Sequence, residues 1–468
     1  MRSYFESIAD YYFDTPLPVL DPDAVHQVKR CLVDFLGCGL LGASMEGSGP
    51  VPAFLFAMDD GTQKADMWGV SKKISAPLAA FANSYFGGIL ELDDAMALGA
   101  SVHPGASVIP AALAAAQETD CDGACFLHAV IFGYDVCNRM GLLSTAKVRE
   151  LGLYGPGLVG ALASASAAGM LYGLTSKQLA DAVSIAASLS PVCPFINFID
   201  GAEVKNIYCG WSSYLGILAV KMAQKGIPGS KRVLDGPKSL ASIYAGQRGL
   251  NVSPREHNFA LDVVFKDFSA CRSVHATLTA IAQLQKQNNI DVEKVERIGI
   301  RTYPYAVDLS DGVERLNPIS ARLHLPYTAA VMLCTGKLEA RSFSEGALGE
   351  KTVRALMEKI YVQRHPAYDA GPFGVRGSEV TVTLTDGTML QAEVHHARWD
   401  KEAPPSDAEL INKFRRLTEG ILCAQARDRL PSLLFALEKQ PDLEPVFACL
   451  RMLERREGDH FYCKEDLS

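Results

Sequence analysis

Residues 157–173, with the sequence GLVGALASASAAGMLYG, set the expectation for the fold. Nearly all of these residues are small or apolar, and the apolar ones recur at helical spacing. Ser164 and Ser166 interrupt the run, which is also shorter than the roughly 18 apolar residues that a membrane span requires. Small side chains let helix axes approach closely. We therefore interpret the segment as a buried helix in a tightly packed, mainly α-helical protein.

The same periodicity extends outward over most of the first half of the chain. From Asp21 to about Gly229, apolar residues recur three and four positions apart, and Asp21-Pro22 is typical of an N-cap followed by proline at the first helical position. Further helices are predicted over ranges rich in alanine and glycine: 76–90, 105–118, 123–140, 160–172, 176–187 and 205–225.

The pattern changes after about Phe265. Residues 295–305 (VERIGIRTYPY) alternate apolar and polar side chains, which predicts a strand. A second alternating run at 379–385 is followed by Asp386-Gly387 and a third run at 389–394, and this order is the signature of a β-hairpin. Two helices are expected between the strands, at 275–287 and 325–336, and extended loops at 191–202 and 365–377.

Beyond Trp399 the helical periodicity returns, at 406–424 and 430–439. We therefore expect a mainly α fold with a large all-α domain built from both chain ends, 1–265 and 400–468. A smaller α+β lid domain, 266–399, is inserted into it.

The composition narrows the classes of partner. The 468 residues are 48% hydrophobic and 21% charged, with a net charge of −8 and no run of five Lys or Arg, which argues against a nucleic-acid partner. No segment is typical of a signal peptide or a membrane span, and the twelve cysteines are scattered mostly singly through apolar surroundings. These features favour a reducing, cytoplasmic location with no membrane partner. Counter-charges for an anionic substrate would have to be local to a pocket.

A first group of candidate residues combines carboxylates with an imidazole. Glu91, Asp93 and Asp94 precede His103 by a short Gly/Ala-rich stretch, and Pro104 then opens a predicted helix whose N-terminal amides favour negative charge. The alternative is that the carboxylates are helix-end charges and that His103 is an imidazole satisfied by its own loop. Spacing alone does not separate these interpretations.

Three further candidates have basic or polar side chains. Lys205 opens an otherwise apolar helix, where it would be better accommodated beside an anion; the alternative is a solvated helix end. At the expected domain junction, Arg272 is suited to binding a carboxylate and His275 to moving a proton, unless they are a surface arginine and a histidine on the apolar face of the next helix. Tyr327 belongs to a polar cluster that could simply cap the helix after it.

Taken together, these segments resemble the MmgE/PrpD family, whose activities include 2-methylcitrate dehydratase, cis-aconitate decarboxylase and iminodisuccinate epimerase. The resemblance spans nearly the whole chain, and the segments that carry it keep their order and spacing: 33–38, Trp68-Gly69, Asp93-Asp94, His103-Pro104, Lys205 with Gly210 and Gly216, Pro326-Tyr327 with Gly336, and 354–359. It implies a large helical domain with an α+β lid, a homodimer, and an active site at the domain junction. His103 and Lys205 then fall on active-site positions, and Tyr327 near the site.

The same comparison reveals departures from the family pattern. Gly88 replaces a histidine ahead of the acidic pair, Glu91 replaces an aspartate, and Ala95 replaces a small hydroxyl residue. Tyr154 takes the place of the histidine in a His-Pro motif, and Cys271 that of a histidine in the decarboxylase.

The expected function is that of a metal-free lyase, a hydro-lyase, that moves a proton next to a carboxylate of a small di- or tricarboxylic acid. We assign His103 as base or acid, Lys205 with Arg272 to stabilise charge, Tyr154 as acid, and Glu91 or Asp94 to orient the imidazole. Asp93, Cys271, His275 and Tyr327, together with Glu91 and Arg272, are expected to contact substrate. No metal or cofactor is required. A decarboxylase, an epimerase or a non-catalytic carboxylate-binding protein are the alternatives.

Overall fold

The computed structural model describes seven ranges of the chain, 3–46, 49–70, 72–97, 102–143, 145–244, 255–369 and 376–454. Two features predicted from the sequence lie partly outside these ranges. They are residues 98–101 of the Gly/Ala-rich stretch before His103 and residues 370–375 of the loop expected at 365–377.

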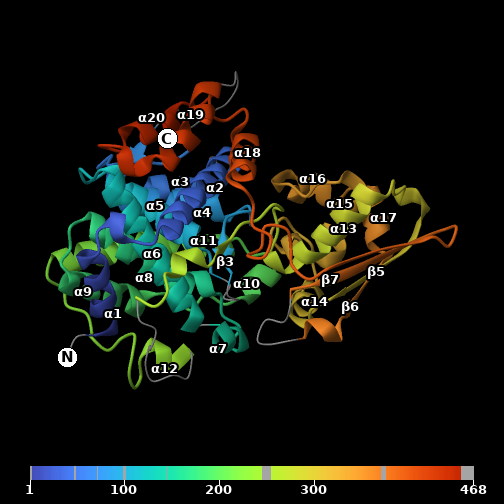
Figure 1. Cartoon of the computed structure of the whole chain (residues 1–468), viewed down its shortest axis with the longest axis horizontal. Coiled ribbons are helices and arrows are strands. Elements are labelled where there is room, and N and C mark those ends of the chain that lie inside the picture. Colours follow the sequence, from blue (N-terminus) through green and yellow to red (C-terminus); the bar gives the residue numbers. More distant parts are fainter. Residues whose placement is uncertain are drawn as a thin grey trace.

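Most of the molecule is a body of packed helices, to which the N-terminal helix α1 and the C-terminal helices α18–α20 both belong (Figure 1). The mainly α character predicted from the sequence is confirmed. In chain order, the helices of this body are α1 (Tyr4–Asp14), α2 (Pro22–Glu46), α3 (Pro50–Met58), α4 (Ala76–Gly88), α5 (Pro104–Ala116), α6 (Gly123–Leu143), α7 (Thr145–Glu150), α8 (Gly155–Leu171), α9 (Ser176–Leu189), α10 (Ile196–Ile199), α11 (Val204–Gln224), α12 (Leu240–Tyr244), α18 (Asp407–Thr418), α19 (Ala424–Phe435) and α20 (Glu444–Arg451).

Helix α8 lies at the centre of the body, packed against α5, α6, α9 and α11. It is buried along almost its whole length, as the small-residue sequence of 157–173 predicts. Its axis approaches its neighbours so closely that a Cβ added at Gly160 would lie 2.4 Å from the hydroxyl of Ser107 on α5. One added at Gly216 of α11 would lie 2.4 Å from the Cβ of Ser164. Glycine at these positions is therefore what allows the helices to touch.

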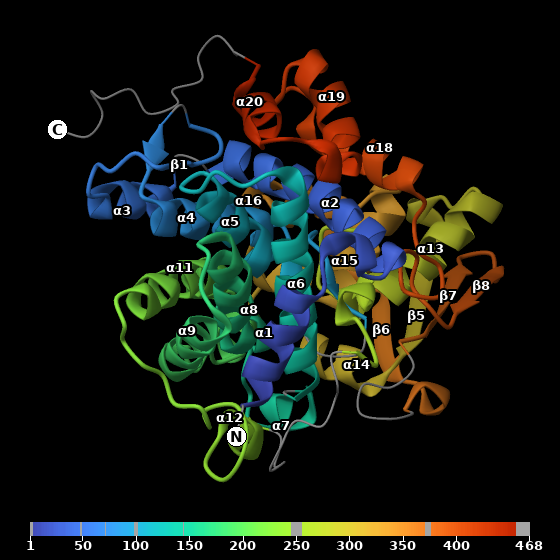
Figure 2. The same ribbon diagram turned by 60° about the vertical axis from the view of Figure 1, so that its left-hand side comes forward.

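The second part of the molecule is a four-stranded sheet covered by helices, to the right in Figures 1 and 2. The strand order is β6-β5-β7-β8, with β5 parallel to β6 and antiparallel to β7. The predicted hairpin is present, since β7 and β8 pair antiparallel around Asp386-Gly387. The elements of this part are α13 (His275–Gln287), β5 (Val295–Thr302), α14 (Pro304–Asp311), α15 (Leu325–Thr335), α16 (Glu345–Leu348), α17 (Lys351–Met357), β6 (Ile360–Arg364), β7 (Ser378–Leu384) and β8 (Met389–Val394).

Each part has its own hydrophobic core. One cluster of buried side chains runs from Phe5 to Phe265 and resumes in the C-terminal helices, with Ala340 as a member from the other part. A second cluster runs from Phe268 to Val394. The proposed domain boundaries, 1–265 with 400–468 and 266–399, agree with this division but stay a prediction.

Short strands and one buried lysine join the segments that cross between the two parts. Strand β3 (Ala95–Met96) pairs antiparallel with β4 (Val263–Val264), just before the chain enters the α+β part. The ammonium of Lys413 on α18 donates to the carboxylate of Asp34 on α2 at 2.7 Å, to the carbonyl of Leu92 at 2.8 Å and to that of Lys266 at 2.9 Å. These contacts fix two loops, around residues 92 and 266, against each other.

Across the ranges that the structure describes, we find no helix with the length and apolar character needed to cross a membrane.

Candidate active site

A cleft lies where the helical body meets the α+β part. It encloses about 500 Å³, including its open mouth. Both parts of the molecule contribute to its walls, with Glu91, Ala95, His103, Tyr154, Phe195, Phe198 and Lys266 from the helical side and the crossing segment, and Cys271, Arg272, Ser273, Tyr303, Tyr305 and Arg376 from the α+β side.

His103 lies in this wall, immediately before the first residue of α5. It occupies the N-cap position, and its side chain makes no capping hydrogen bond. Instead Nδ1 lies 2.9 Å from Oδ2 of the buried Asp93. A carboxylate at Nδ1 fixes the tautomer and leaves Nε2 as the nitrogen available to the cleft. The prediction that Glu91 or Asp94 orients the imidazole was therefore wrong, because Asp93 makes this contact.

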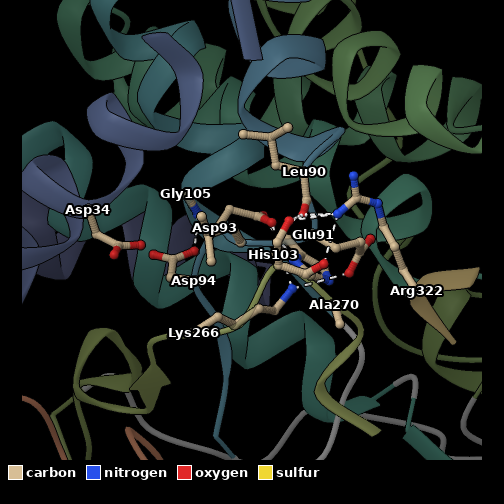
Figure 3. A network of polar contacts seen from close by, with 12 residues as sticks. Asp34, Leu90, Glu91, Asp93, Asp94, His103, Gly105, Lys266, Ala270 and Arg322 are labelled. Carbon is tan, nitrogen blue, oxygen red and sulfur yellow. Dashed lines mark hydrogen bonds and ion pairs between the residues drawn. The ribbon is translucent and has the colours of Figure 1, made fainter. Parts of the chain in front are cut away.

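Glu91 forms ion pairs with two lysines, of which Lys266 is labelled in Figure 3. One carboxylate oxygen pairs with Lys205, and the other accepts from Lys266 at 3.2 Å. Burial alone would raise the pKa of Glu91, but the two ammonium groups outweigh it and hold that pKa well below its usual range. The Glu91 backbone has a φ of +50°, a left-handed conformation that non-glycine residues rarely adopt.

The two lysines are placed differently with respect to the cleft. Lys266 lines it, and although burial lowers the pKa of this lysine, Glu91 and Asp93 raise it by more, so Lys266 remains a cation. Lys205 is not among the described residues that line the cleft. Its ammonium pairs with Glu91 and packs over the Phe198 ring, 4.3 Å from the ring centroid. Of the two lysines, Lys266 is therefore the one at the cleft wall, and the charge-stabilising role that we assigned to Lys205 stays a prediction.

Tyr154 precedes α8 and forms an aromatic wall with Phe195 and Phe198. Its ring centroid lies 6.4 Å from that of His103. Burial, together with the nearby negative charge of Glu91, raises the pKa of Tyr154 well above its ordinary value. The phenol therefore keeps its proton and can act as a hydrogen-bond donor or an acid, as the sequence suggested, but not as a base.

Cys271 and Arg272 bring the α+β part to the cleft. Burial raises the pKa of the Cys271 thiol. The thiol therefore keeps its proton and lines the cleft as an uncharged group rather than as a nucleophile. Arg272 donates from Nη1 to the carbonyl of Met96 at 2.7 Å and pairs through Nη2 with Asp400. Burial, and then repulsion by Arg376, lowers the pKa of Arg272 to about 10, which leaves it a cation at neutral pH.

Five of the ten predicted residues do not line the cleft. Lys205 and Asp93 contact residues that do, as described above, and the other three are Asp94, His275 and Tyr327. Asp94 accepts from the backbone of Gly105 at 2.9 Å and from the hydroxyl of Tyr134 at 2.7 Å, on the far side of Asp93 (Figure 3). His275 is buried, with Nε2 donating to the carbonyl of Ala270 at 3.0 Å, and burial lowers its pKa to about 3. The Tyr327 hydroxyl donates to the carbonyl of Ser342.

The sequence reasoning missed Lys266, Tyr303, Tyr305 and Arg376 as cleft residues. A signal existed for two of them. Tyr303 and Tyr305 flank Pro304 at the end of the predicted strand. Polar residues at the end of a strand are commonly functional. Lys266 lies in an apolar stretch directly before the predicted junction, and its reach to Glu91 depends on how the chain crosses between the two parts.

No cluster of three or more His, Cys, Asp or Glu side chains suited to hold a metal ion is found among the residues that the structure describes. What the cleft does present is a buried imidazole–carboxylate pair, a protonated phenol and several cations. Such a set suits proton transfer on a substrate that carries carboxylates.

Comparison with known proteins gives a consistent result. Residues 6–253 match the MmgE/PrpD N-terminal domain and residues 268–434 the MmgE/PrpD C-terminal domain. The chain is 28% identical to a cis-aconitate decarboxylase from Mus musculus, in an alignment that covers 97% of this chain and 94% of the relative. It is 23% identical to a cis-aconitate decarboxylase from Aspergillus terreus over 92% of each chain. A 2-methylcitrate dehydratase from Salmonella typhimurium matches a shorter region, with 28% identity over 33% of this chain and 34% of the relative.

Proposed function

The chain belongs to the MmgE/PrpD family, a family of lyases, and on that premise we propose that it eliminates water from a small di- or tricarboxylic acid by proton transfer next to a carboxylate. One observation carries the proposal. The imidazole of His103, held at Nδ1 by Asp93, lines the same cleft as the ammonium of Lys266. A base beside a fixed cation is what the removal of a proton next to a carboxylate requires.

The elimination uses groups that line the cleft. Nε2 of His103 takes the proton from the carbon next to the carboxylate, and Lys266 stabilises the negative charge that develops on the carboxylate oxygens. The electron pair of the broken C–H bond forms the double bond as the C–O bond at the neighbouring carbon breaks. Tyr154 donates its proton to the departing hydroxide, which leaves as water. The phenolate regains a proton from solvent, and the imidazolium loses one.

Glu91 and Lys205 support this chemistry without taking part in bond breaking. Glu91 holds Lys266 at the wall through one carboxylate oxygen and pairs with Lys205 through the other. Asp93, with Oδ1 3.8 Å from the ammonium of Lys266, supplies the second negative charge that offsets the two lysines. These contacts keep the ammonium of Lys266 fixed before substrate arrives, so little reorganisation is needed when charge develops.

Decarboxylation is a second candidate, favoured by the similarity to cis-aconitate decarboxylases over 97% of the chain. In that reaction the C–C bond to one carboxylate breaks, carbon dioxide leaves, and the resulting carbanion is protonated by His103. Both reactions use the same imidazole and the same cation, but they differ in what leaves the substrate.

The test is to incubate purified protein with 2-methylcitrate, citrate and cis-aconitate, and to follow water loss by NMR and carbon dioxide release with carboxyl-labelled acid. We expect His103→Ala to lower kcat by about 10²–10⁴-fold. His396→Ala, whose side chain is about half exposed, is the matched control and should leave kcat unchanged. Full turnover in His103→Ala would contradict the assignment. An acid that raises Tm in the wild type without being converted would indicate a binding protein.

We also propose that the protein is a homodimer, as the family resemblance implies. Light scattering should then give a molar mass of twice the 50.5 kDa of the chain. A mass equal to that of one chain at micromolar concentration would contradict it.

A further inference from the structure

Two arginines line the cleft from the α+β part, whereas His103 lines it from the helical body. Arg272 lies in a short helical turn (Arg272–Val274) just before α13, and Arg376 lies two residues before β7. Both line the cleft, together with Tyr303 and Tyr305. They are close enough for the charge of Arg376 to lower the pKa of Arg272. Two like charges brought together at a cleft wall repel each other unless an anion lies between them.

The two guanidinium groups differ in how they are held. Arg272 is anchored by the Met96 carbonyl and by Asp400, so it is fixed before any ligand arrives. Arg376 makes no hydrogen bond or ion pair with any residue in the described part of the chain. Its backbone is nevertheless fixed, because the carbonyl of the next residue, Gly377, accepts from the hydroxyl of Thr302 at 2.7 Å. A Cβ on Gly377 would lie 2.6 Å from the Tyr368 ring, so the chain passes tightly over that ring here.

The remaining charges of the site are already balanced. Glu91 and Asp93 offset Lys205 and Lys266, and Asp400 offsets Arg272. Arg376 is the cation left over among the described residues of the cleft. Because a guanidinium presents a planar fork of donors, a carboxylate is the anion whose shape it matches.

We propose that Arg376, together with Arg272, binds a second carboxylate of the substrate and thereby selects acids that carry two or more carboxylates. The first carboxylate lies at Lys266, next to the carbon that His103 deprotonates, and the second spans the cleft to the arginines. This inference rests on the proposed function and specifies its substrate class. It also gives the α+β part a role in recognition, since both arginines belong to it.

The experiment measures binding by calorimetry with acids that cannot react, so that it does not depend on turnover. Tricarballylate and succinate are titrated, at fixed ionic strength, into wild type, Arg376→Gln, Arg376→Lys and Arg364→Gln. Arg364→Gln is the matched control, since its side chain is 63% exposed and pairs with a surface aspartate. We expect Arg376→Gln to weaken tricarballylate binding by about 10- to 100-fold. The affinity of Arg376→Lys for tricarballylate should lie between those of Arg376→Gln and wild type, and the affinity of the control should equal that of wild type.

A second readout separates recognition from chemistry. With a converted acid, Arg376→Gln should raise KM by a similar factor and leave kcat within about threefold, because the arginine contacts the substrate far from the reacting carbon. Equal affinity of wild type and Arg376→Gln for tricarballylate would overturn the proposal while leaving the lyase function intact. If wild type bound none of these acids, the proposed function itself would fail.

Discussion

Nδ1 of His103 lies 2.9 Å from Oδ2 of Asp93, and the two side chains are buried together at the wall of the cleft. The carboxylate accepts from Nδ1, which fixes the ring so that Nε2 is the nitrogen available for proton transfer. This relationship gives Asp93 a positioning role, because it acts on substrate through the imidazole.

Replacement of this carboxylate should therefore impair catalysis more than folding. Asp93→Asn offers an amide that can donate to Nδ1 and so favours the wrong tautomer. We expect kcat to fall by about 10²–10⁴-fold and the pH dependence of kcat to change, with little change in Tm. Asp94→Asn, one position along and bonded to Gly105 and Tyr134, is the control. Equal kcat values for the two variants would show that Asp93 does not position His103.

Glu91→Gln should be among the most destabilising substitutions of the site. It leaves Lys205 and Lys266 buried without their shared carboxylate, and breaking a buried ion pair from one side costs about 3–5 kcal/mol. The double variant Glu91→Gln/Lys205→Met removes one of the two stranded charges and should recover part of the loss. Unfolding followed by fluorescence in urea gives the comparison. If the double variant lost more stability than Glu91→Gln and Lys205→Met lose in total, this account would be contradicted.

Asp94 predicts a specific pH dependence of stability. Burial raises its pKa from 3.8 to about 7, so between these values the folded protein holds a proton that the unfolded chain has released. Stability should therefore fall as pH rises from about 4 to 7 and level off above 7. The side chain in Asp94→Asn cannot ionise, so the amount by which the Tm of this variant exceeds that of wild type should grow as pH rises over the same range. A difference in Tm that does not change with pH would show that Asp94 does not titrate there.

Lys413 of α18 should be essential for stability although it is remote from the substrate. Lys413→Met leaves Asp34 buried without a counter-charge, and we expect a loss of about 3–5 kcal/mol at pH 8. Burial already raises the pKa of Asp34, and without the ammonium it should rise further. An acid whose folded pKa is raised destabilises the fold as pH rises, so the loss should be smaller at pH 5 than at pH 8. Lys413→Met/Asp34→Leu should recover stability at both pH values.

Much of the fold could be predicted because its signals are local. The bounds of α13 agree with the predicted helix at both ends, and the hairpin of β7 and β8 is where Asp386-Gly387 indicates. Strand β6 was missed, because five residues without a turn partner carry no local signal and their pairing with β5 is parallel and long-range. Helices α1, α3 and α20 were also missed, although Ser3 and Glu6 form a capping box at the start of α1.

The site was less predictable than the fold, for a physical reason. His103 and Tyr154 could be identified from the sequence, but which carboxylate holds the imidazole depends on the path of the loop between α4 and α5. Lys205 and Lys266 carry the same ammonium group, and both pair with Glu91. Which of the two lines the cleft depends on how the chain folds around Glu91. Arg376 belongs to no recognisable sequence motif. The role that we propose for it follows from the absence of a hydrogen-bond or ion-pair partner among the described residues.

The β3–β4 ladder joins Ala95 and Val264, which come from opposite halves of the chain. The loop with Glu91 and Asp93 and the segment with Lys266 are thus brought together by a contact between residues far apart in the chain. Contacts between distant residues form slowly, because a long loop must close first. The helices can therefore form before Lys266 reaches Glu91 and Asp93. A chain halted at that stage during refolding would have most of its helical circular dichroism and no activity, so the order of folding separates acquisition of structure from acquisition of function.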